Sequence, residues 1–495
     1  MRPLLTFALL ILCSCQATPR RAGLDESLER IDRFVHTAYE VGASAGLGVG
    51  VAVDGRVEYV SNLGMADISA GIPATGETLW YVASTSKSFT GFGIALLATS
   101  GEIDVAAPIT TYLPNAEWPE GVDPDSLTVG DFLGHTHGMG NGALVISAAF
   151  TGAFPESEYG RLLQFNEVGS RELRYSNLGY NVASMVIDAV RPEGWKTFLE
   201  HEVYNPAGMG ELYSNVSSLD SARIAKPHRA RIDGTYYTIP FVKRDITMNA
   251  AGGHLGSIES LTRWTVVQMD GGRIDGRQVF PEKAVALSHE ILSTHDRQFA
   301  FFQRDGWGMG WDVGSYGDEP MVSRFGGYSR TRSHLSFLPD QRLGVVAQVN
   351  GPGGSALTDI IAAYVYDVMM DRPDADSLAQ TRLEEVRSQV AEVPEQVARF
   401  EAVQQSRLNP YPRPLSDYAG TYADDALGSV RFEHVRDTLR MHWGVLEGPT
   451  TVFDADSHQL RFSLFGSGAV ATFAFDGDGP ADRVELFGRE LMRQR

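Results

Sequence analysis

The pair of residues best suited to covalent chemistry is Ser84 and Lys87, three positions apart in Trp80-Tyr-Val-Ala-Ser-Thr-Ser-Lys87. A serine hydroxyl becomes a nucleophile when a neighbouring base takes its proton, and a lysine amine can be that base. The apolar run that follows, ending at Gly101, predicts a buried helix with Ser84 in its first turn. Positions i and i+3 share a helix face, so the amine can reach the hydroxyl. The N–H groups at such a helix N-terminus also favour a developing oxyanion.

A tyrosine and an asparagine further along the chain add a candidate base and an orienting amide. Tyr175 and Asn177 stand just before a stretch that predicts a helix through Val190. In an extended segment alternate side chains point the same way, so both are expected to face one cleft. A lysine near a tyrosine lowers the pKa of the tyrosine, and partial desolvation lowers the pKa of the lysine. Each motif is common alone, and Tyr-Ser-Asn is also an ordinary turn, so the hypothesis depends on their combination.

A second serine matches a different nucleophile pattern. Gly42-Ala-Ser-Ala-Gly46 fits Gly-x-Ser-x-Gly, which requires a strand before the serine and a helix after it. Here a helix predicted over 24–39 comes first and a strand predicted from Gly48 follows. Because this order is reversed, Ser44 is not expected to be the nucleophile.

Two histidines and two cysteines are the remaining candidates for metal ligands. His135 and His137 lie in a predicted glycine turn without a nearby carboxylate, and no HExxH motif occurs, so a structural role is favoured over metal binding. The only cysteines, Cys13 and Cys15, fall within the first 15 residues, which leaves the body of the chain without a thiolate site. No metal and no cofactor are expected.

The composition indicates a large folded protein with an acidic surface. The chain has 495 residues, 43% of them hydrophobic, and a net charge of −20. This charge argues against nucleic acid or an anionic membrane surface as a partner. Its simplest role is to keep the protein in solution.

The N-terminus predicts export. Met1-Arg2 precedes a short apolar run that ends at Leu12, which is typical of a secretory signal and too short to span a bilayer. The following Cys13-Ser14-Cys15 resembles a bacterial lipoprotein leader, with Cys15 as the lipid anchor; ordinary cleavage near Ala17 is the alternative. Residues 1–22 are therefore interpreted as a leader, and the protein is placed in the cell envelope or periplasm, with membrane contact only through the anchor.

The elements that must position the serine follow from hydrophobic periodicity and turn residues. The expected order is a helix over 24–39, a hairpin around Asp54-Gly55, the buried helix that has Ser84 in its first turn and ends at Gly101, a helix over 258–269, strands over 335–338 and 343–349, and a closing helix over 356–370. Terminal helices with antiparallel hairpins between them predict an α+β fold, in which an antiparallel sheet is covered by the N- and C-terminal helices.

Residues 373–495 are predicted to form a linker and a small all-β domain. Residues 373–412 are charged and then proline-rich, and Pro394 is expected to end or kink any helix there. Residues 413–495 contain six short predicted strands separated by turn residues, a size that suits an independent barrel-like domain. The predicted units are thus 1–22, 23–372, 373–412 and 413–495.

Taken together, these motifs resemble the serine hydrolase family of class C β-lactamases, low-molecular-weight penicillin-binding proteins and related esterases. Residues 81–90 resemble the nucleophile helix of that family, and Tyr175-Ser-Asn177 its Tyr-x-Asn motif. Weaker similarity is spread over 128–138, 205–209, 252–253, 308–311 and 333–351. The resemblance covers about residues 24 to 370 and implies a β-lactamase/transpeptidase-like fold with a helical domain. The tail resembles the lipocalin-like β module often appended to such hydrolases.

One motif departs from the family pattern. Where Lys-Thr-Gly or His-x-Gly is usual, the chain has Arg324-Phe325-Gly326, and Arg330-Thr331 stands where Gly-Phe is usual. The resemblance places Arg324, Gly326 and Gly327 on the substrate side, with the N–H groups of Ser84 and Gly327 as the oxyanion hole. Arginine can pair with a carboxylate but cannot serve as a base, and Phe325 removes a hydroxyl that would contact a substrate carboxylate.

The sequence therefore predicts a serine hydrolase that acts through an acyl-enzyme on Ser84, with Lys87, Tyr175 and Asn177 in the catalytic group. Its substrate is an ester, a D-amino-acid peptide or a β-lactam, small or peptidoglycan-like, with esterase or peptidase favoured over β-lactamase because of Arg324 and Phe325. One alternative is a non-catalytic envelope binding protein on the same fold, and another is a partner-binding role centred on the C-terminal module. The oligomeric state is left open.

Overall fold

The computed structural model describes residues 23–406, 410–464 and 467–495. The leader predicted for residues 1–22, with Cys15, lies outside the described residues, so export and lipid anchoring stay predictions. Within these described ranges, no helix combines the length and the apolar character needed to cross a membrane.

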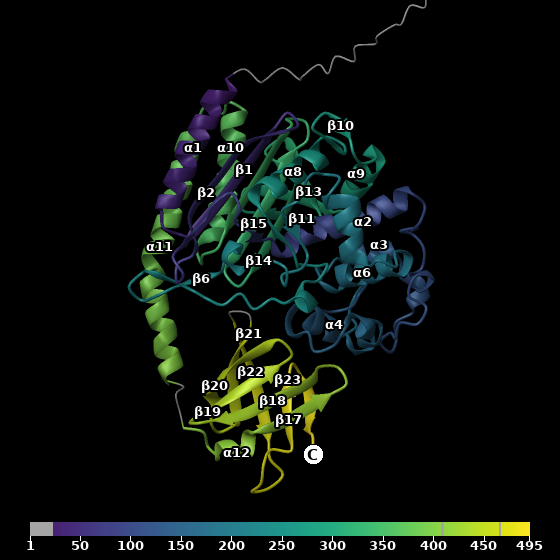
Figure 1. Cartoon of the computed structure of the whole chain (residues 1–495), viewed down its shortest axis with the longest axis vertical. Helices are drawn as coiled ribbons and strands as arrows, with labels where there is room; N and C mark the ends of the chain where they lie inside the picture. Colours follow the sequence, from purple (N-terminus) through teal and green to yellow (C-terminus); the bar gives the residue numbers. More distant parts are fainter. Residues whose placement is uncertain (1–22, 407–409, 465–466) are drawn as a thin grey trace, which may run out of the picture.

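A nine-stranded antiparallel sheet forms the centre of the larger unit (Figure 1). Its spatial order is β11 (Ser293–Phe299), β12 (Phe302–Trp307), β13 (Asp312–Tyr316), β14 (Glu319–Tyr328), β15 (Thr331–Leu338), β16 (Leu343–Val349), β1 (Gly46–Val53), β2 (Arg56–Asp67) and β3 (Ile72–Pro73). β1 and β16, the first and last strands of this unit along the chain, pair with Leu47 opposite Val349, so the two ends of the unit meet inside the sheet. The Asp54-Gly55 hairpin is confirmed between β1 and β2.

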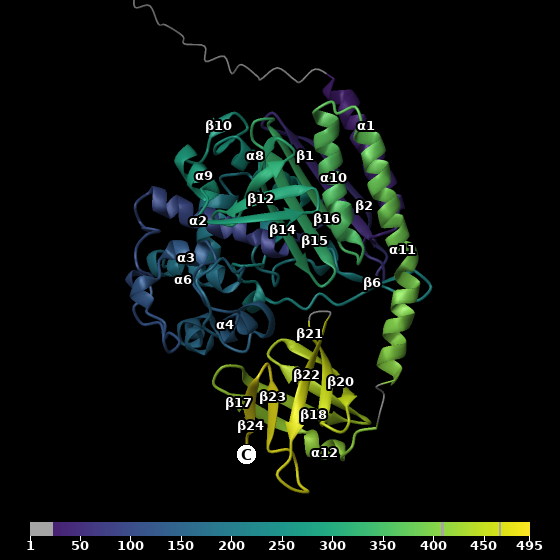
Figure 2. The same ribbon diagram turned by 180° about the vertical axis from the view of Figure 1, so that it is seen from behind.

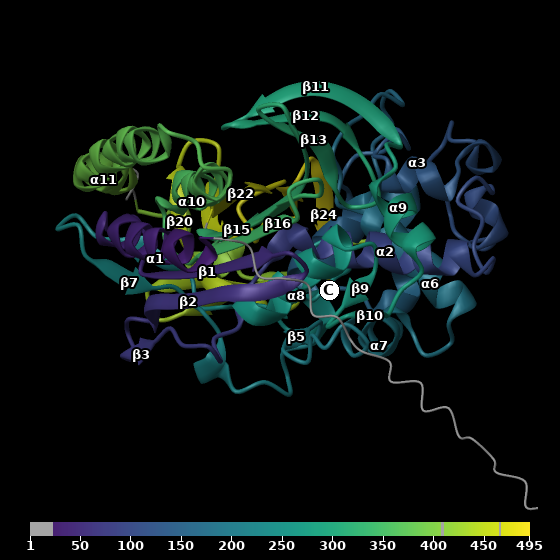
Figure 3. The ribbon, with the colours of Figure 1, turned by 90° about the horizontal axis from the view of Figure 1, so that it is seen from above.

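Helices cover both faces of the sheet. Figure 3 shows α1 (Leu24–Glu40), α10 (Gly354–Met369) and α11 (Ala375–Ser406) on one face and α8 (Ile258–Met269) on the other. Successive side chains of a strand point to opposite faces, and accordingly Val345 joins the core beneath α10 while Val346 joins the core beneath α8. The predicted α+β class, with terminal helices on the sheet, is confirmed.

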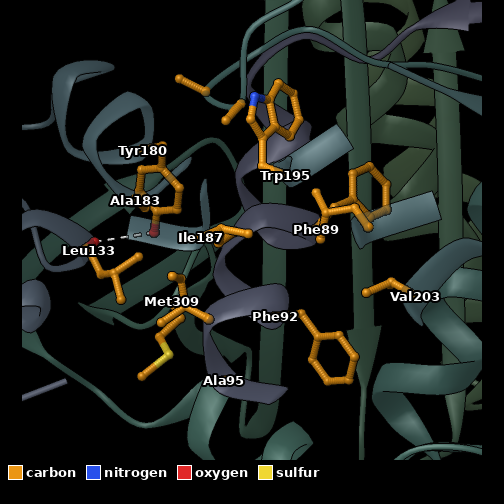
Figure 4. Close-up of a cluster of buried hydrophobic side chains, with 14 of the residues drawn as sticks. Phe89, Phe92, Ala95, Leu133, Tyr180, Ala183, Ile187, Trp195, Val203 and Met309 are labelled. Carbon is orange, nitrogen blue, oxygen red and sulfur yellow. Dashed lines mark hydrogen bonds between the residues drawn. The ribbon is translucent and has the colours of Figure 1, made fainter. Parts of the chain in front are cut away.

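The helix that begins beside Ser84 is surrounded by other helices. α2 (Ser86–Thr99) packs against α6 (Leu178–Val190), α7 (Trp195–Leu199) and α9 (Glu282–His289). Its phenylalanines, Phe89 and Phe92, lie in the apolar cluster of Figure 4, where the Tyr180 hydroxyl donates to the Leu133 carbonyl at 3.2 Å. A helix that is apolar all round is a buried helix. This packing fixes the helix axis and with it the direction of the Lys87 side chain.

The C-terminal unit is a closed barrel of eight strands. They are β17 (Gly420–Asp424), β18 (Gly428–Val435), β19 (Thr438–Trp443), β20 (Leu446–Asp454), β21 (Gln459–Leu464), β22 (Ser467–Ala474), β23 (Arg483–Leu486) and β24 (Arg489–Arg493). The sequence predicted six of them and missed β20 and β24. β20 contains Gly448-Pro449, which usually marks a turn, and β24 is short and has Arg489, Glu490 and Arg493 among its five residues.

The segment between the two units is a single long helix. α11 runs for 32 residues and continues through Pro394. Of the two outcomes expected for this proline, an end of the helix is therefore wrong, and a kink stays a prediction. A proline inside a helix costs roughly 3 kcal/mol. The first half of α11 offsets this cost by packing on α10 through the buried residues Ala379, Leu383 and Val386.

One of the contacts between the barrel and the helical part is the turn Gly444-Val445, between β19 and β20. The Val445 N–H donates to the Thr151 carbonyl at 2.7 Å. Gly444 has a φ of +56°, and a Cβ at this position would lie 1.9 Å from the Thr151 oxygen. The close approach therefore requires glycine at position 444.

We expect Gly444→Ala to weaken this docking. The added methyl group meets a backbone oxygen and is forced into a left-handed conformation, which costs about 1–3 kcal/mol. Hydrogen exchange of residues 146–154 should become faster in the variant. The matched control is Gly448→Ala in β20, where a Cβ has no neighbour within 4 Å; equal exchange in both variants would contradict the assignment.

Candidate active site

Ser84 lies in a tight turn between a short strand and the buried helix. β4 (Trp80–Tyr81) pairs with β8 (Leu255–Gly256) and leads into a 3-10 turn over Ala83–Thr85, directly before α2. Ala83 has a φ of +47°, which is rare for a residue with a side chain. The turn places the serine at the N-terminal end of α2, and Lys87 follows in the first turn of the helix.

Lys87 is fully buried and is held by two acceptors. Its Nζ donates to Asn177 Oδ1 at 2.7 Å and to the Ala251 carbonyl at 2.7 Å. Burial, together with the charge of Arg324, lowers the pKa of Lys87 to about 8. An amine with such a pKa is partly neutral near pH 8 and can exchange a proton with its neighbours. The role of Ala251 could not be predicted from the sequence, because it contributes a backbone carbonyl.

Tyr175 presents its hydroxyl to the same centre. The residue is 43% exposed, but its hydroxyl accepts a hydrogen bond from Arg324 Nη2 at 2.7 Å. Burial of the phenol would raise the pKa of Tyr175; the charges of Arg324 and Lys87, with polar contacts to Lys87 and Ser84, outweigh that effect and lower it to about 8. Ser84, Lys87 and Tyr175 are therefore brought together, as the sequence predicted.

The loop that carries Tyr175 is not a simple extended segment. Asn177 has helical angles, φ −75° and ψ −23°, and caps α6. Both Tyr175 and Asn177 face the centre because the chain turns between them. They were expected to face one cleft, but as alternate residues of an extended segment, which this loop is not. Asn141, which the sequence analysis missed, holds this turn: its Oδ1 accepts from the N–H groups of Asn177 at 2.9 Å and Leu178 at 3.2 Å.

Arg324 forms hydrogen bonds with both Ser84 and Tyr175. Besides its bond to Tyr175, its Nε donates to the Ser84 carbonyl at 3.0 Å, and its Nη1 donates to Asp312 Oδ2 at 3.2 Å. The side chains of Arg324 and Asp312 are 5% and 3% exposed. All three guanidinium nitrogens thus contact protein groups, so this structure gives Arg324 a positioning role, and its substrate-binding role stays a prediction.

The other two residues of Arg324-Phe325-Gly326 point to opposite faces of β14. Gly326 lies against the nucleophile turn, since a Cβ there would be 2.0 Å from the Val82 carbonyl oxygen. Phe325 packs in the core on the α10 face, with its ring centroid 4.7 Å from that of His334. The N–H groups of Ser84 and Gly327 stay the predicted oxyanion donors.

The other residues considered from the sequence have structural contacts. Ser44 is buried and donates to the Gly46 carbonyl at 2.8 Å, at the start of β1. His135 Nδ1 accepts from the Ser176 N–H at 3.3 Å, and His137 Nδ1 accepts from the Met139 N–H at 3.1 Å. The His135 contact helps to hold the turn between Tyr175 and Asn177.

Comparison with known proteins agrees with this fold and motif set. The sequence model of the Beta-lactamase family matches residues 31–367, more than half of the chain. The protein belongs to the Beta-lactamase family, and the resemblance found in the sequence is confirmed.

Individual relatives are distant. "Unguisins hydrolase ungD'" of Aspergillus campestris is 23% identical over 400 residues, covering 76% of this chain and 72% of its own. Two solved structures share the fold. The octameric penicillin-binding protein homologue from Pyrococcus abyssi has a TM-score of 0.58 and 17% identity and covers 94% of this chain and 100% of its own. The D-amino acid amidase from Ochrobactrum anthropi SV3 has a TM-score of 0.56 and 17% identity and covers 72% of this chain and 99% of its own.

We expect Gly326→Ala to lower the reactivity of Ser84 by roughly 100-fold. The new Cβ would push β14 away from the nucleophile turn, and a misplacement of this size costs roughly 100-fold in rate. The measurement is the rate at which a fluorophosphonate probe labels the protein. Gly327→Ala is the matched control, because its Cβ would have only the Thr331 oxygen nearby, at 3.8 Å. Equal loss in both variants would contradict the close contact at Gly326.

We also expect Arg324→Gln to shift the pH dependence of labelling. In the unaltered protein the rate should rise through pH 8, where Tyr175 and Lys87 lose protons. Loss of the Arg324 charge raises the pKa of both groups, so the rise should move upward by about one pH unit or more, whichever group is the base.

Arg304→Gln controls for the lost partner of Asp312. Arg304 Nη1 lies 3.6 Å from Asp312 Oδ1, and it is not among the groups that shift the pKa of Tyr175. Its profile should keep its midpoint. An unshifted profile for Arg324→Gln would show that Arg324 does not set the ionisation of the site.

Proposed function

We propose that the protein is a serine hydrolase that cleaves esters or amides of D-amino acids through an acyl-enzyme on Ser84. The observation that supports this most strongly is the pair of lowered pKa values, both about 8, at Lys87 and Tyr175 beside the serine. Such perturbed groups next to a nucleophile are typical of a site that moves protons near neutral pH.

In the proposed acylation step, the Ser84 oxygen attacks the carbonyl carbon while its proton passes to the Tyr175 phenolate. The tetrahedral oxyanion is stabilised by the N–H groups of Ser84 and Gly327, a contribution of roughly 2.7–4 kcal/mol per donor in other hydrolases. The C–N or C–O bond then breaks, and the leaving group takes the proton from Tyr175. Lys87 holds the positive charge that favours the phenolate, and Asn177 orients Lys87.

In deacylation, water attacks the acyl carbon and gives one proton to the same tyrosine. The C–O bond to Ser84 breaks, and the serine oxygen recovers that proton. The substrate acid is released and the starting protonation state is restored. No group outside the chain is needed to balance either step.

Two features favour an ester or D-amino-acid amide over a β-lactam. The Arg324 guanidinium already contacts Asp312, and Phe325 is turned into the core, so neither offers the free group that would recognise a penicillin carboxylate. The D-amino acid amidase named above shares the fold, and its name points to an amide of a D-amino acid. The leader-like N-terminus suggests that the substrate is met in the cell envelope.

The test is turnover of a panel: p-nitrophenyl esters, D-phenylalanine amide, D-alanyl peptides and a chromogenic cephalosporin. Esters and D-amino-acid compounds should be hydrolysed faster than the cephalosporin. Ser84→Ala should lower every rate by roughly 1,000-fold or more, while Ser44→Ala, the other serine in a nucleophile-like pattern, should retain activity. Labelling by fluorophosphonate that survives in Ser84→Ala would overturn the proposal, and a faster cephalosporin would overturn the substrate assignment alone.

A further inference from the structure

A cavity of about 950 Å³ lies at the junction of α11, the barrel and the hairpin of β6 (His228–Ala230) and β7 (Tyr236–Thr238). Figures 1 and 2 show α11 running past the end of the sheet to the side of the barrel. The cavity is separate from the candidate active site, since neither Ser84 nor Tyr175 is among the described residues that line it. Its volume is within the range of about 300–1,000 Å³ for small-molecule sites.

One wall of the cavity is an apolar stripe along α11. The residues of this stripe are Val386, Val390, Val393, Val397 and Phe400. They are spaced by three or four positions, so they share one helix face. Phe400 is 51% exposed although it lines the cavity. The first and last members are fourteen positions apart, a length of roughly 21 Å, which is suited to an extended acyl chain.

The cavity is also lined by arginines, one of which, Arg461, lies 5.7 Å from the centroid of the Phe400 ring. The arginines are Arg229 and Arg231 on or beside β6, Arg330 in the β14–β15 turn, and Arg461 on β21. Among the described lining residues, Glu401 is the one acidic side chain. Within the described parts of the chain, Arg330 and Arg461 form no ion pair with a carboxylate. Such a concentration of cations on a chain with a net charge of −20 indicates a site for an anion.

Among its described residues, the interior of the barrel has no space for a ligand with both an apolar chain and a charged group. It is filled by aromatic and aliphatic side chains that are buried against one another, among them Tyr422, Phe432, Trp443 and Phe473. Phe432 and Phe473 are in direct ring contact, with centroids 4.9 Å apart. The space available for an amphipathic molecule is therefore outside the barrel, between it and α11.

We propose that this cavity binds an anionic amphiphile with one long acyl chain and a carboxylate or phosphate head group. The chain lies along the α11 stripe, and the head group faces the arginines, whose planar guanidinium groups match carboxylate and phosphate oxygens. A hollow of this volume suits a small molecule better than a protein partner, which needs a surface of about 800 Å² on each side. The inference does not depend on the proposed hydrolase activity.

The experiment is calorimetric titration of the full chain with palmitate, below the concentration at which palmitate forms micelles. We expect saturable binding of one molecule per chain. Dodecyltrimethylammonium, which has a chain but a positive head group, should bind at least tenfold more weakly, and inorganic phosphate should not displace palmitate. No saturable palmitate binding, equal binding of the cationic amphiphile, or displacement by phosphate alone would overturn the proposal.

Two variants of the same helix locate the site. Val397→Glu puts a negative charge on the stripe and should weaken palmitate binding by at least tenfold. Val403→Glu makes the same change at a 46% exposed position of α11 that does not line the cavity, and it should leave binding unchanged. Circular dichroism and thermal unfolding of both variants check that the helix is retained. Equal weakening by the two substitutions would overturn the assignment of the stripe as the binding wall.

Discussion

The site depends on a shortage of negative charge around two buried cations. Lys87 and Arg324 both lie next to Tyr175, and Asp312 contacts Arg324 while Lys87 contacts the uncharged acceptors Asn177 and Ala251. Burying unpaired charge is costly, so the surroundings favour loss of a proton from Lys87 or from Tyr175. Burial and the Arg324 charge lower the pKa of Lys87 to about 8, and the charges of Arg324 and Lys87 lower the pKa of Tyr175 to about 8. A proton acceptor beside Ser84 is the consequence on which the proposed function depends.

The fold keeps these groups in place by close backbone approach between segments that are far apart in the sequence. Gly91 of α2 lies against Met309, Gly310 lies against the Lys87 carbonyl, and Gly326 of β14 lies against Val82; a Cβ at any of them would come within 2.2 Å of a backbone oxygen. The packed interior does not deform continuously. The nucleophile turn is therefore held between α2 and β14, with little freedom to move away from the tyrosine.

Much of this was predictable from the sequence, and the failures have physical causes. The i, i+3 spacing placed Ser84 and Lys87 correctly because helix geometry is local. Asn141 and Asp312 were missed because their roles come from tertiary contacts of ordinary-looking residues. The orientation of Phe325 into the core could not be read from a motif, and α11 continues through Pro394 because its packing on α10 outweighs a local preference.

The most direct measurement of the central claim is the pKa of Tyr175 itself. Labelling the 18 tyrosines with ¹³C at Cζ and titrating by NMR, with Tyr175→Phe to assign the signal, gives this value without reference to any substrate. The account predicts one resonance that titrates near pH 8 and is lost in the variant. A Tyr175 resonance that remains protonated beyond pH 10, the ordinary range for tyrosine, would contradict it.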